Sequence, residues 1–237
     1  MIKLLDILLE DENILIPRRS KEERSKNHII VIQKKIQQYI KDGSKGDLNL
    51  RNAPIESLPD NLKVGGSLDL WNTPIQSLPD NLSVGGNLYL GNTQIKSLPN
   101  NLSVEGDLEL TNTPIQSLPD NLTVGGNLNL YYTKIQSLPN NLKVGNGLYL
   151  TKTPIQSLPD NLTVGGSLEL NYTQIKTLPD NLKVGGSLDL SNTKIQSLPD
   201  NLTVGDSLAL SNTPIAIKYD EEEIRKMVPN VKRYIFI

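Results

Sequence analysis

Cysteine is absent from the 237-residue sequence, and histidine occurs once, as His28. A chain without cysteine has no disulfides, no thiolate metal ligands and no cysteine nucleophile. A single imidazole excludes a multi-histidine metal site and leaves His28 as the one candidate for histidine acid–base chemistry. The sequence therefore predicts no metal centre and no cofactor.

The chain also has no large excess of charge of one sign and no long apolar run. Lysine and arginine total 24 against 26 acidic residues, giving a formal charge of −2, which argues against nucleic-acid binding. No apolar run approaches the roughly 20 residues that span a bilayer, so we expect no membrane partner. The start MIKLLDILLE is interrupted by Asp6 and Glu10 and has no small-residue cleavage site after it, so we expect no standard secretory signal. Aromatic residues are 4% of the chain, so aliphatic side chains must build the core.

What the chain does contain is a repeat with an unbroken period of 20 residues. The unit reads G-x-L-x-L-x-N-T-x-I-x-S-L-P-D-N-L-x-V-G. Fixed self-similarity at this period predicts a solenoid, in which each unit buries its apolar face against its neighbours. Copies 1 to 8 begin at Gly46, Gly66, Gly86, Gly106, Gly126, Asn146, Gly166 and Gly186, and a half-copy covers residues 206–216.

The spacing of apolar residues within one copy indicates the shape of the coil. In copy 2 the apolar positions are separated by 2, 5, 3, 4 and 2 residues, which suits neither a continuous helix nor a long strand. The series favours one short strand followed by an irregular return, and the proline of each copy favours an extended rather than helical return. We expect glycine pairs such as Gly65–Gly66 to supply positive φ at a sharp turn. The inward positions of copy 2 are Leu68, Leu70, Ile75, Leu78, Leu82 and Val84.

The segment from Leu68 to Ile75, which reads L-x-L-x-x-T-x-I, and the following Leu78-Pro79 resemble the leucine-rich repeats of the short, 20-residue bacterial Leu-Pro type. The resemblance implies an α/β solenoid with one short parallel strand per repeat and a recognition role without catalysis. Threonine replaces the family's ladder asparagine, and we expect its hydroxyl to bond toward neighbouring turns.

The solenoid needs a cap at each end, because the terminal coils would otherwise expose apolar edges. Residues 1–45 predict a helical N-terminal cap, 46–216 the solenoid with eight full repeats and a half, and 217–237 a C-terminal cap of a helix and a strand. Ser20 with Glu23 and Asp220 with Glu223 form capping-box patterns. We also expect a short helix over 1–9, an apolar helix face and a closing strand over 231–237. The helix face consists of Ile29, Ile32, Ile36 and Ile40.

Outward positions on and beside the predicted strand vary from copy to copy, whereas inward positions do not. Tryptophan and tyrosine often dominate the energy of protein interfaces, and acidic neighbours favour a basic partner. An alternative is that these residues only cover the sheet, because tyrosine suits strands. The candidate partner-binding residues are Trp71, Tyr89, Tyr131, Tyr132, Tyr149, Tyr172, Asp69, Glu109, Glu169 and Asp189.

These features favour a non-catalytic scaffold that binds a protein partner through a concave parallel sheet. No nucleophile–base constellation accompanies the carboxylates, so we expect no enzyme. Two alternatives stay open. The start MIKLLDILLE with IPRRSKEER resembles proteins of bacteriophage genomes, which implies a structural or assembly component of a phage particle, and the aromatic face also suits carbohydrate. We expect a cytoplasmic location in a bacterial or phage-infected cell, with virion association as the alternative.

Overall fold

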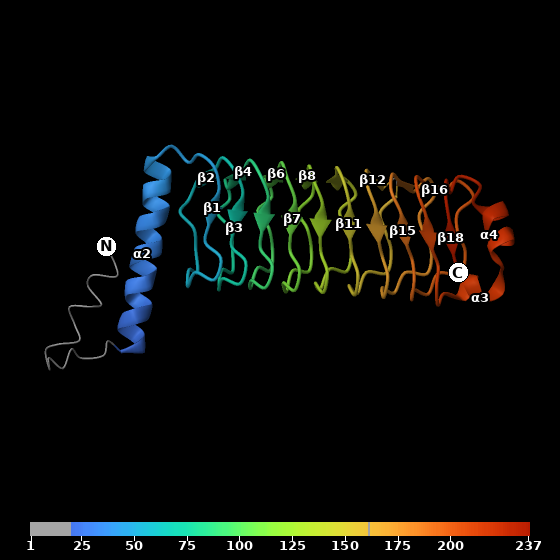
Figure 1. Cartoon of the computed structure of the whole chain (residues 1–237), viewed down its shortest axis with the longest axis horizontal. Helices are drawn as coiled ribbons and strands as arrows, with labels where there is room; N and C mark the ends of the chain where they lie inside the picture. Colours follow the sequence, from blue (N-terminus) through green and yellow to red (C-terminus); the bar gives the residue numbers. More distant parts are fainter. Residues whose placement is uncertain (1–19, 161) are drawn as a thin grey trace, which may run out of the picture.

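Each copy forms one coil, because its two leucines enter a strand and its Leu-Pro segment returns the chain to the start of the next copy. The computed structural model describes residues 20–160 and 162–237, and in it the coils stack into a solenoid with helices at both ends (Figure 1). The helix expected over 1–9 lies outside the described residues. No helix in the described part of the chain is both long and apolar enough to cross a membrane.

The Leu-x-Leu segments pair in parallel to form sheet A, which has ten strands in the described residues. The register is constant, since Leu48 lies opposite Leu68 and Leu68 lies opposite Leu88. The expected leucine-rich-repeat-like solenoid is therefore confirmed by strand direction and register. In order along the stack, sheet A consists of β1 (Leu48–Asn49), β3 (Leu68–Asp69), β5 (Leu88–Tyr89), β7 (Leu108–Glu109), β9 (Leu128–Asn129), β11 (Leu148–Tyr149), β13 (Leu168–Glu169), β15 (Leu188–Asp189), β17 (Leu208–Ala209) and β18 (Ile235–Phe236).

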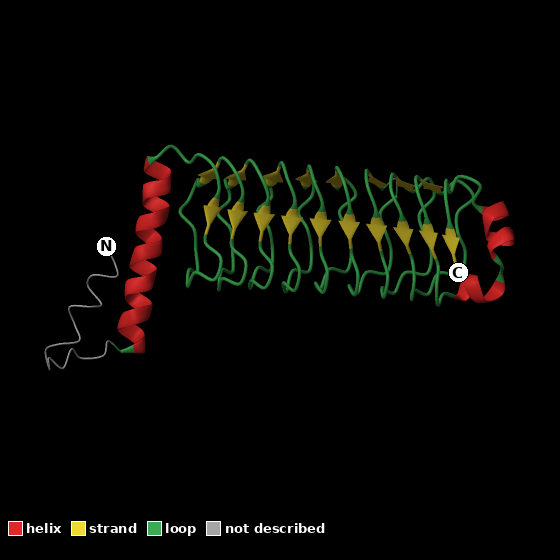
Figure 2. Ribbon diagram, viewed as in Figure 1, coloured by secondary structure: helices red, strands yellow, loops and turns green. Residues whose placement is uncertain are grey.

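A second parallel sheet, sheet B, was not expected from the sequence, which predicted one strand per copy. The x-Val segment of each full copy pairs with its equivalents, and sheet B lies behind sheet A along the upper edge in Figure 2. Both sheets take one strand from each full copy, so both advance by the same interval of about 4.8 Å. Such a coil favours a straight stack, and we call the predicted concave surface the sheet A face. Sheet B consists of β2 (Lys63–Val64), β4 (Ser83–Val84), β6 (Ser103–Val104), β8 (Thr123–Val124), β10 (Lys143–Val144), β12 (Thr163–Val164), β14 (Lys183–Val184) and β16 (Thr203–Val204).

Columns of aliphatic side chains fill the space between the two sheets. In copy 2 the side chains of Leu68, Leu70 and Ile75 are 0% exposed, and Leu78, the most exposed of the inward set, is 8% exposed. The return segment that follows Ile75 contains no helix, in agreement with its proline. The inward positions expected from the apolar spacing are thus confirmed.

The glycine pairs have a different role from the one expected. Among the glycines of the described residues, only Gly43 and Gly46 have positive φ, at 85° and 73°. At Gly145, by contrast, a Cβ atom would lie 2.1 Å from the carbonyl oxygen of Gly125 in the preceding copy. Glycine recurs at this position in every full copy except copy 3, which has Glu105, because the coils elsewhere approach too closely for a side chain.

The threonine ladder also differs from expectation, because its hydroxyls bond within their own coil. Thr73 Oγ1 donates to the carbonyl oxygen of Leu70 at 2.8 Å, and every later copy repeats this bond at 2.6–2.8 Å. Each threonine is buried, so the bond satisfies a hydroxyl that would otherwise be desolvated without a partner. The threonines therefore tighten the turn after each sheet A strand.

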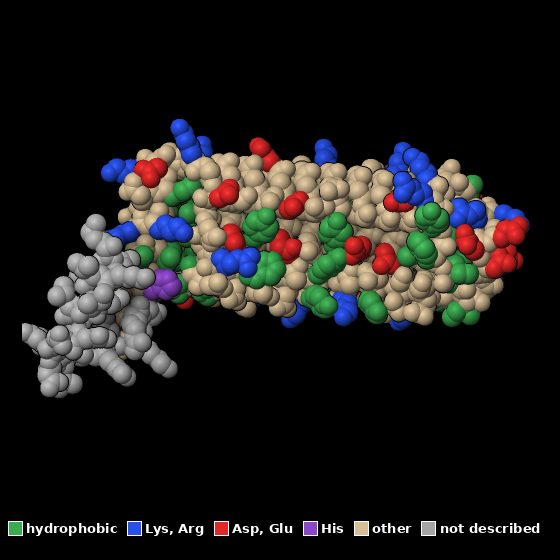
Figure 3. Space-filling view, viewed as in Figure 1, with side chains coloured by type: hydrophobic (Ala, Val, Ile, Leu, Met, Phe, Trp, Pro, Cys, Tyr) green, Lys and Arg blue, Asp and Glu red, His purple; other side chains and the backbone are tan. Residues whose placement is uncertain are grey.

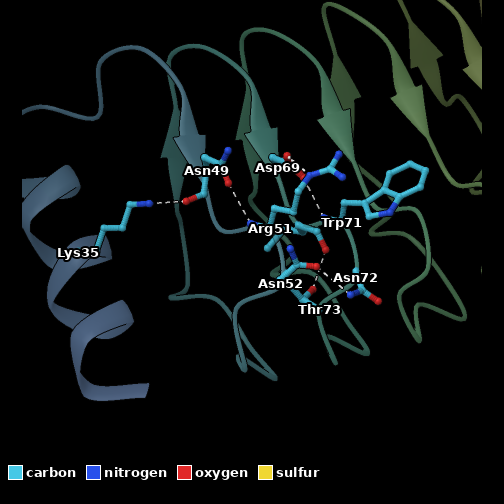
Figure 4. Close-up of polar contacts among 9 residues, drawn as sticks. Lys35, Asn49, Arg51, Asn52, Asp69, Trp71, Asn72 and Thr73 are labelled. Atoms are coloured by element: carbon cyan, nitrogen blue, oxygen red, sulfur yellow. Dashed lines mark hydrogen bonds and ion pairs between the residues drawn. The ribbon is translucent and has the colours of Figure 1, made fainter. Parts of the chain in front are cut away.

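Helix α2 (Lys21–Lys41) covers the N-terminal end of the stack and begins with the expected capping box of Ser20 and Glu23. Its expected apolar face is only partly buried. Ile36 is buried, Ile29 and Ile32 are half-buried, and Ile40 is 43% exposed. Polar contacts add to the attachment, since Lys35 Nζ donates to the carbonyl of Asn49 at 2.5 Å (Figure 4).

The C-terminal end is closed by two short helices and a strand. Helix α3 (Pro214–Lys218) begins within the half-copy, and α4 (Glu221–Met227) starts at the expected capping box of Asp220 and Glu223. The closing strand is β18, which pairs with β17, so Ile235 lies opposite Leu208. The tenth strand therefore continues sheet A into the cap.

The close approach of the coils gives a stability prediction for Gly145→Ala. The new Cβ would overlap the Gly125 carbonyl, so the coils must separate locally, and we expect a loss of about 1–3 kcal/mol in the free energy of unfolding. Chemical denaturation measures the loss. The matched control is Glu105→Ala at the equivalent, exposed position of copy 3, where a Cβ is already present and the change should be close to neutral. Equal stability of the two variants would contradict this packing argument.

Candidate interaction surface

Three columns of side chains cover the sheet A face. The first column holds residues 47, 67, 87 and so on, the second 49, 69 and 89, and the third 51, 71 and 91. In the first column, side-chain oxygens accept from the backbone N–H of the next copy, as Asp47 Oδ1 does from Ser67 at 2.7 Å. Five further pairs along the column, up to Ser167 with Ser187, repeat this bond. Small acceptors are thus favoured here by the backbone, although copy 6 has Gly147 instead.

The four candidate carboxylates lie in the second column, and each has an intramolecular partner. Asp69, Glu109 and Asp189 accept from the backbone N–H two residues further on, at 2.7–2.9 Å, which ends their strand in a turn. Asp69 also forms a 3.0 Å ion pair with Arg51. Glu169 accepts a hydrogen bond from the hydroxyl of Tyr131. The acidic residues are therefore held by contacts inside the molecule.

Trp71 lies along the sheet rather than projecting from it (Figure 4). A Cβ at Gly91 would lie 2.3 Å from the indole ring, so the ring covers the glycine of the next copy. On the other side, the Arg51 guanidinium carbon lies 5.2 Å from the ring centroid, a cation–π geometry. Asp69 in turn fixes Arg51. The half-buried indole is thus held in one orientation between its neighbours.

Tyr131 and Tyr149 form a second aromatic group in the middle of the face, with ring centroids 5.8 Å apart. The hydroxyl of Tyr131 reaches Glu169 two copies away, and the ring of Tyr149 covers Gly147, where a Cβ would lie 2.4 Å from the tyrosine oxygen. Burial, and then the bond to Glu169, raise the pKa of Tyr131 above its ordinary range. Burial and the carboxylates of Glu169 and Asp107 likewise raise the pKa of Tyr149. Both phenols are therefore neutral hydrogen-bonding groups near pH 7.

Tyr132 and Tyr172 lie apart from these groups, at the corner where the chain leaves the sheet A face. They are 54% and 51% exposed. Between them Lys152 places its ammonium 5.0 Å from the Tyr132 ring centroid and 5.5 Å from that of Tyr172. We call Tyr132, Lys152 and Tyr172 the corner strip.

Tyr89 lies opposite Asp69 in sheet A, and its hydroxyl accepts from Asn87 Nδ2 at 2.6 Å. Of the ten sequence candidates, the structure therefore brings together Trp71 with Asp69, and Tyr131 with Tyr149 and Glu169. The space-filling view shows hydrophobic side chains gathered at separate places on this face, with acidic ones beside them (Figure 3).

Four further residues belong to this surface and were not among the candidates predicted from the sequence. Arg51 and Lys152 stack on aromatic candidates, and their positions one period away from Trp71 and Tyr172 were the available signal. Tyr234 and Phe236 were assigned to the cap, but β18 brings them onto the sheet A face, where their ring centroids lie 6.0 Å apart. Their alternation around the buried Ile235 is the pattern of a strand with one buried face.

No cluster of three or more acidic or histidine side chains with the arrangement of a metal site occurs in the part of the chain that the structure describes. A groove of about 620 Å³ runs between α2 and copy 1, with Ile29, Ile36, Pro54 and Ile55 in its lining. His28 is exposed on α2. The groove is largely aliphatic and holds no constellation of reactive groups.

Neither a protein-family model nor a curated protein sequence matches this chain. Among solved structures, the chain is similar to YopM from Yersinia enterocolitica WA-314, at 16% identity and a TM-score of 0.24, with 98% of this chain and 81% of that chain covered. At that TM-score the likeness carries no functional argument, and the leucine-rich-repeat-like fold rests on the strands and registers described above.

The bond between Tyr131 and Glu169 predicts a pH effect. Glu169→Gln removes the negative charge and should lower the pKa of Tyr131, although burial keeps the pKa above its ordinary value. Because the pKa of Tyr131 is raised in the folded state, the neutral hydroxyl contributes its full share to the free energy of unfolding below about pH 10, the ordinary tyrosine value. That contribution is lost as pH rises through the folded-state pKa. Carbon-13 NMR of the tyrosine Cζ atoms measures the titration, with Tyr131→Phe to assign the signal. Identical titration of Tyr131 in both proteins would refute the coupling.

Proposed function

We propose that this protein is a non-catalytic scaffold that binds a protein partner through the aromatic groups of the sheet A face. The observation that carries the proposal is the fixed orientation of Trp71, Tyr131 and Tyr149, which are held by neighbouring side chains while remaining partly exposed. Solenoids of this kind present extended surfaces of adjacent repeats, which suits recognition of another macromolecule.

Pre-organisation supports binding because a side chain that is already ordered loses little conformational entropy on association. Trp71 is held between Arg51 and Gly91, and Tyr149 rests on Gly147. Gly91 and Gly147 stand where other copies have side chains, which leaves room for these rings. Tryptophan and tyrosine in such sites are the residues that contribute most at protein interfaces.

The acidic part of the predicted site contributes less to this proposal than the aromatic part. Asp69, Glu109 and Asp189 hold backbone N–H groups, so a basic partner would compete with the bonds that end their strands. The proposal therefore depends on the rings. No contact among the described residues favours the carbohydrate or phage-particle alternatives.

Affinity capture from a bacterial lysate, followed by a binding measurement with the identified partner, tests the proposal. We expect the combined change Trp71→Ala, Tyr131→Ala and Tyr149→Ala to weaken partner binding at least about tenfold, because buried aromatic anchors each contribute about 1 kcal/mol or more. Isothermal titration calorimetry gives the affinities. The thermal unfolding midpoint and circular dichroism establish that the variant is folded.

The matched control changes exposed side chains on sheet B, Lys143→Ala and Lys183→Ala, and should leave the affinity unchanged. If the aromatic variant is folded and binds the partner as well as the unchanged protein does, the sheet A face is not the binding surface. If the control alone weakens binding, the partner contacts sheet B instead.

A further inference from the structure

The corner strip departs from the repeat at a position where the backbone restricts the choice of residue. All nine corner positions, from residue 52 to residue 212, have φ between 56° and 60°, the left-handed region. Asparagine tolerates this region better than other residues with a Cβ. Six copies have asparagine there, and the three that do not are consecutive. The exceptions are Tyr132, Lys152 and Tyr172.

The left-handed backbone is unchanged where the residue changes. Tyr132, Lys152 and Tyr172 have φ of 58°, 57° and 60°, the same as the asparagines on either side, so the strain of a larger side chain is not relieved. Asparagines in this column also bond to one another, as Asn72 Nδ2 does to Asn52 Oδ1 at 2.8 Å and Asn112 to Asn92 at 2.8 Å. The strip lacks the favourable backbone fit and the amide–amide bonds of asparagine, and keeps one weaker bond between copies, in which Lys152 Nζ donates to the Tyr132 hydroxyl at 3.3 Å.

Burial does not compensate for this loss, because about half of each tyrosine remains exposed. The stacking of Lys152 on both rings compensates in part, since an exposed cation–π contact is weakly stabilising. Residues that break a local rule without an evident structural gain mark functional sites more often than other positions. The strip therefore suits a binding role better than a packing role.

The charge around the strip identifies the chemistry of a partner. Two residues after Tyr132 lies Lys134, and the same region of the next copies carries Lys176 and Lys194, all exposed. In residues 132–137, 152–157, 172–177 and 192–197, these three lysines and Lys152 meet no acidic residue. Within the described part of the chain, none of the four forms an ion pair with a carboxylate. With these three lysines, the corner strip belongs to a basic and aromatic surface that crosses copies 5 to 8. This surface is about 15 Å long, since four coils span three intervals.

We propose that the corner strip, together with Lys134, Lys176 and Lys194, binds an acidic, extended segment of a protein partner, about five residues long. This inference rests on the proposed function for the partner being a protein, but it uses a surface separate from the aromatic groups of the sheet A face. Four lysines attract carboxylates, and the two tyrosine rings provide flat apolar contact for the intervening side chains. A peptide is favoured over a single-stranded nucleic acid because the chain as a whole is acidic and the adjoining face carries Glu109, Glu169 and Asp189. These carboxylates would repel any anionic chain that extends beyond the strip, so a short acidic segment is favoured over a longer phosphate backbone.

The test is an NMR titration of the full chain with deca-glutamate at low salt, with deca-lysine and single-stranded deca-thymidine as comparison probes. We expect deca-glutamate to shift the amide signals of Tyr132, Lys152 and Tyr172, with weaker binding as salt is added. The key variant restores the repeat's own residue, as Tyr132→Asn, Lys152→Asn and Tyr172→Asn together. It should bind deca-glutamate at least about tenfold more weakly. Its thermal unfolding midpoint should be equal to or higher than that of the unchanged protein, because asparagine suits the left-handed backbone.

A matched charge control is Lys96→Asn, which removes one exposed lysine from copy 3 and should leave the shifts at the strip in place. Absence of peptide-dependent shifts at the strip, or tighter binding of deca-thymidine than of deca-glutamate, would overturn the proposal. A lower unfolding midpoint of the triple asparagine variant would also overturn it, because the strip would then be structural. Failure of the sheet A face leaves this titration unaffected, so the two proposals fail separately.

Discussion

Parallel pairing at a constant offset of twenty residues is the constraint on which the rest of this structure depends. Leu48 lies opposite Leu68 in sheet A and Val64 opposite Val84 in sheet B, and later copies keep the offset. Coils paired in this way lie about 4.8 Å apart, a spacing that leaves no room for a Cβ at Gly145. The same offset places equivalent side chains in columns. Each column therefore has one physical environment, sampled once per copy.

The inward columns and the caps could be predicted because their signals lie in single copies or single turns. Leu68 and Ile75 are apolar at every equivalent position, and the Asp220 and Glu223 pair is a local signature of a helix start. Sheet B could not be predicted in this way. Its strands, such as Lys63–Val64, are two residues long and have no alternation of their own. They pair because the twenty-residue offset that aligns the strands of sheet A also aligns them.

The candidate surface was predictable as a set of columns but not as a set of contacts. Period alone places Trp71 and Arg51 one copy apart, yet the direction in which the indole lies depends on the space left by Gly91. The role of Asp69 depends on the N–H group of Trp71, which the end of a two-residue strand leaves without a strand partner. The sequence shows the charge of such a carboxylate, but its intramolecular bonds appear only in the folded coil. Alternation along the strand therefore predicted these side chains to be exposed, but it did not predict that many of them already have partners inside the molecule.

Variation among copies has a different meaning in different columns. The second column of the sheet A face has Asn49, Tyr89 and Ala209 on the same extended backbone, so a change there reveals little about function. The corner column has a left-handed backbone at every copy, and a large side chain such as tyrosine or lysine is less favourable there than asparagine. A repeat protein thus contains its own reference, because the same backbone appears with and without the departure. By comparison with that reference, Tyr132 and Tyr172 indicate a functional role more strongly than the half-buried aromatic residues do, because packing against neighbours already accounts for the half-buried ones.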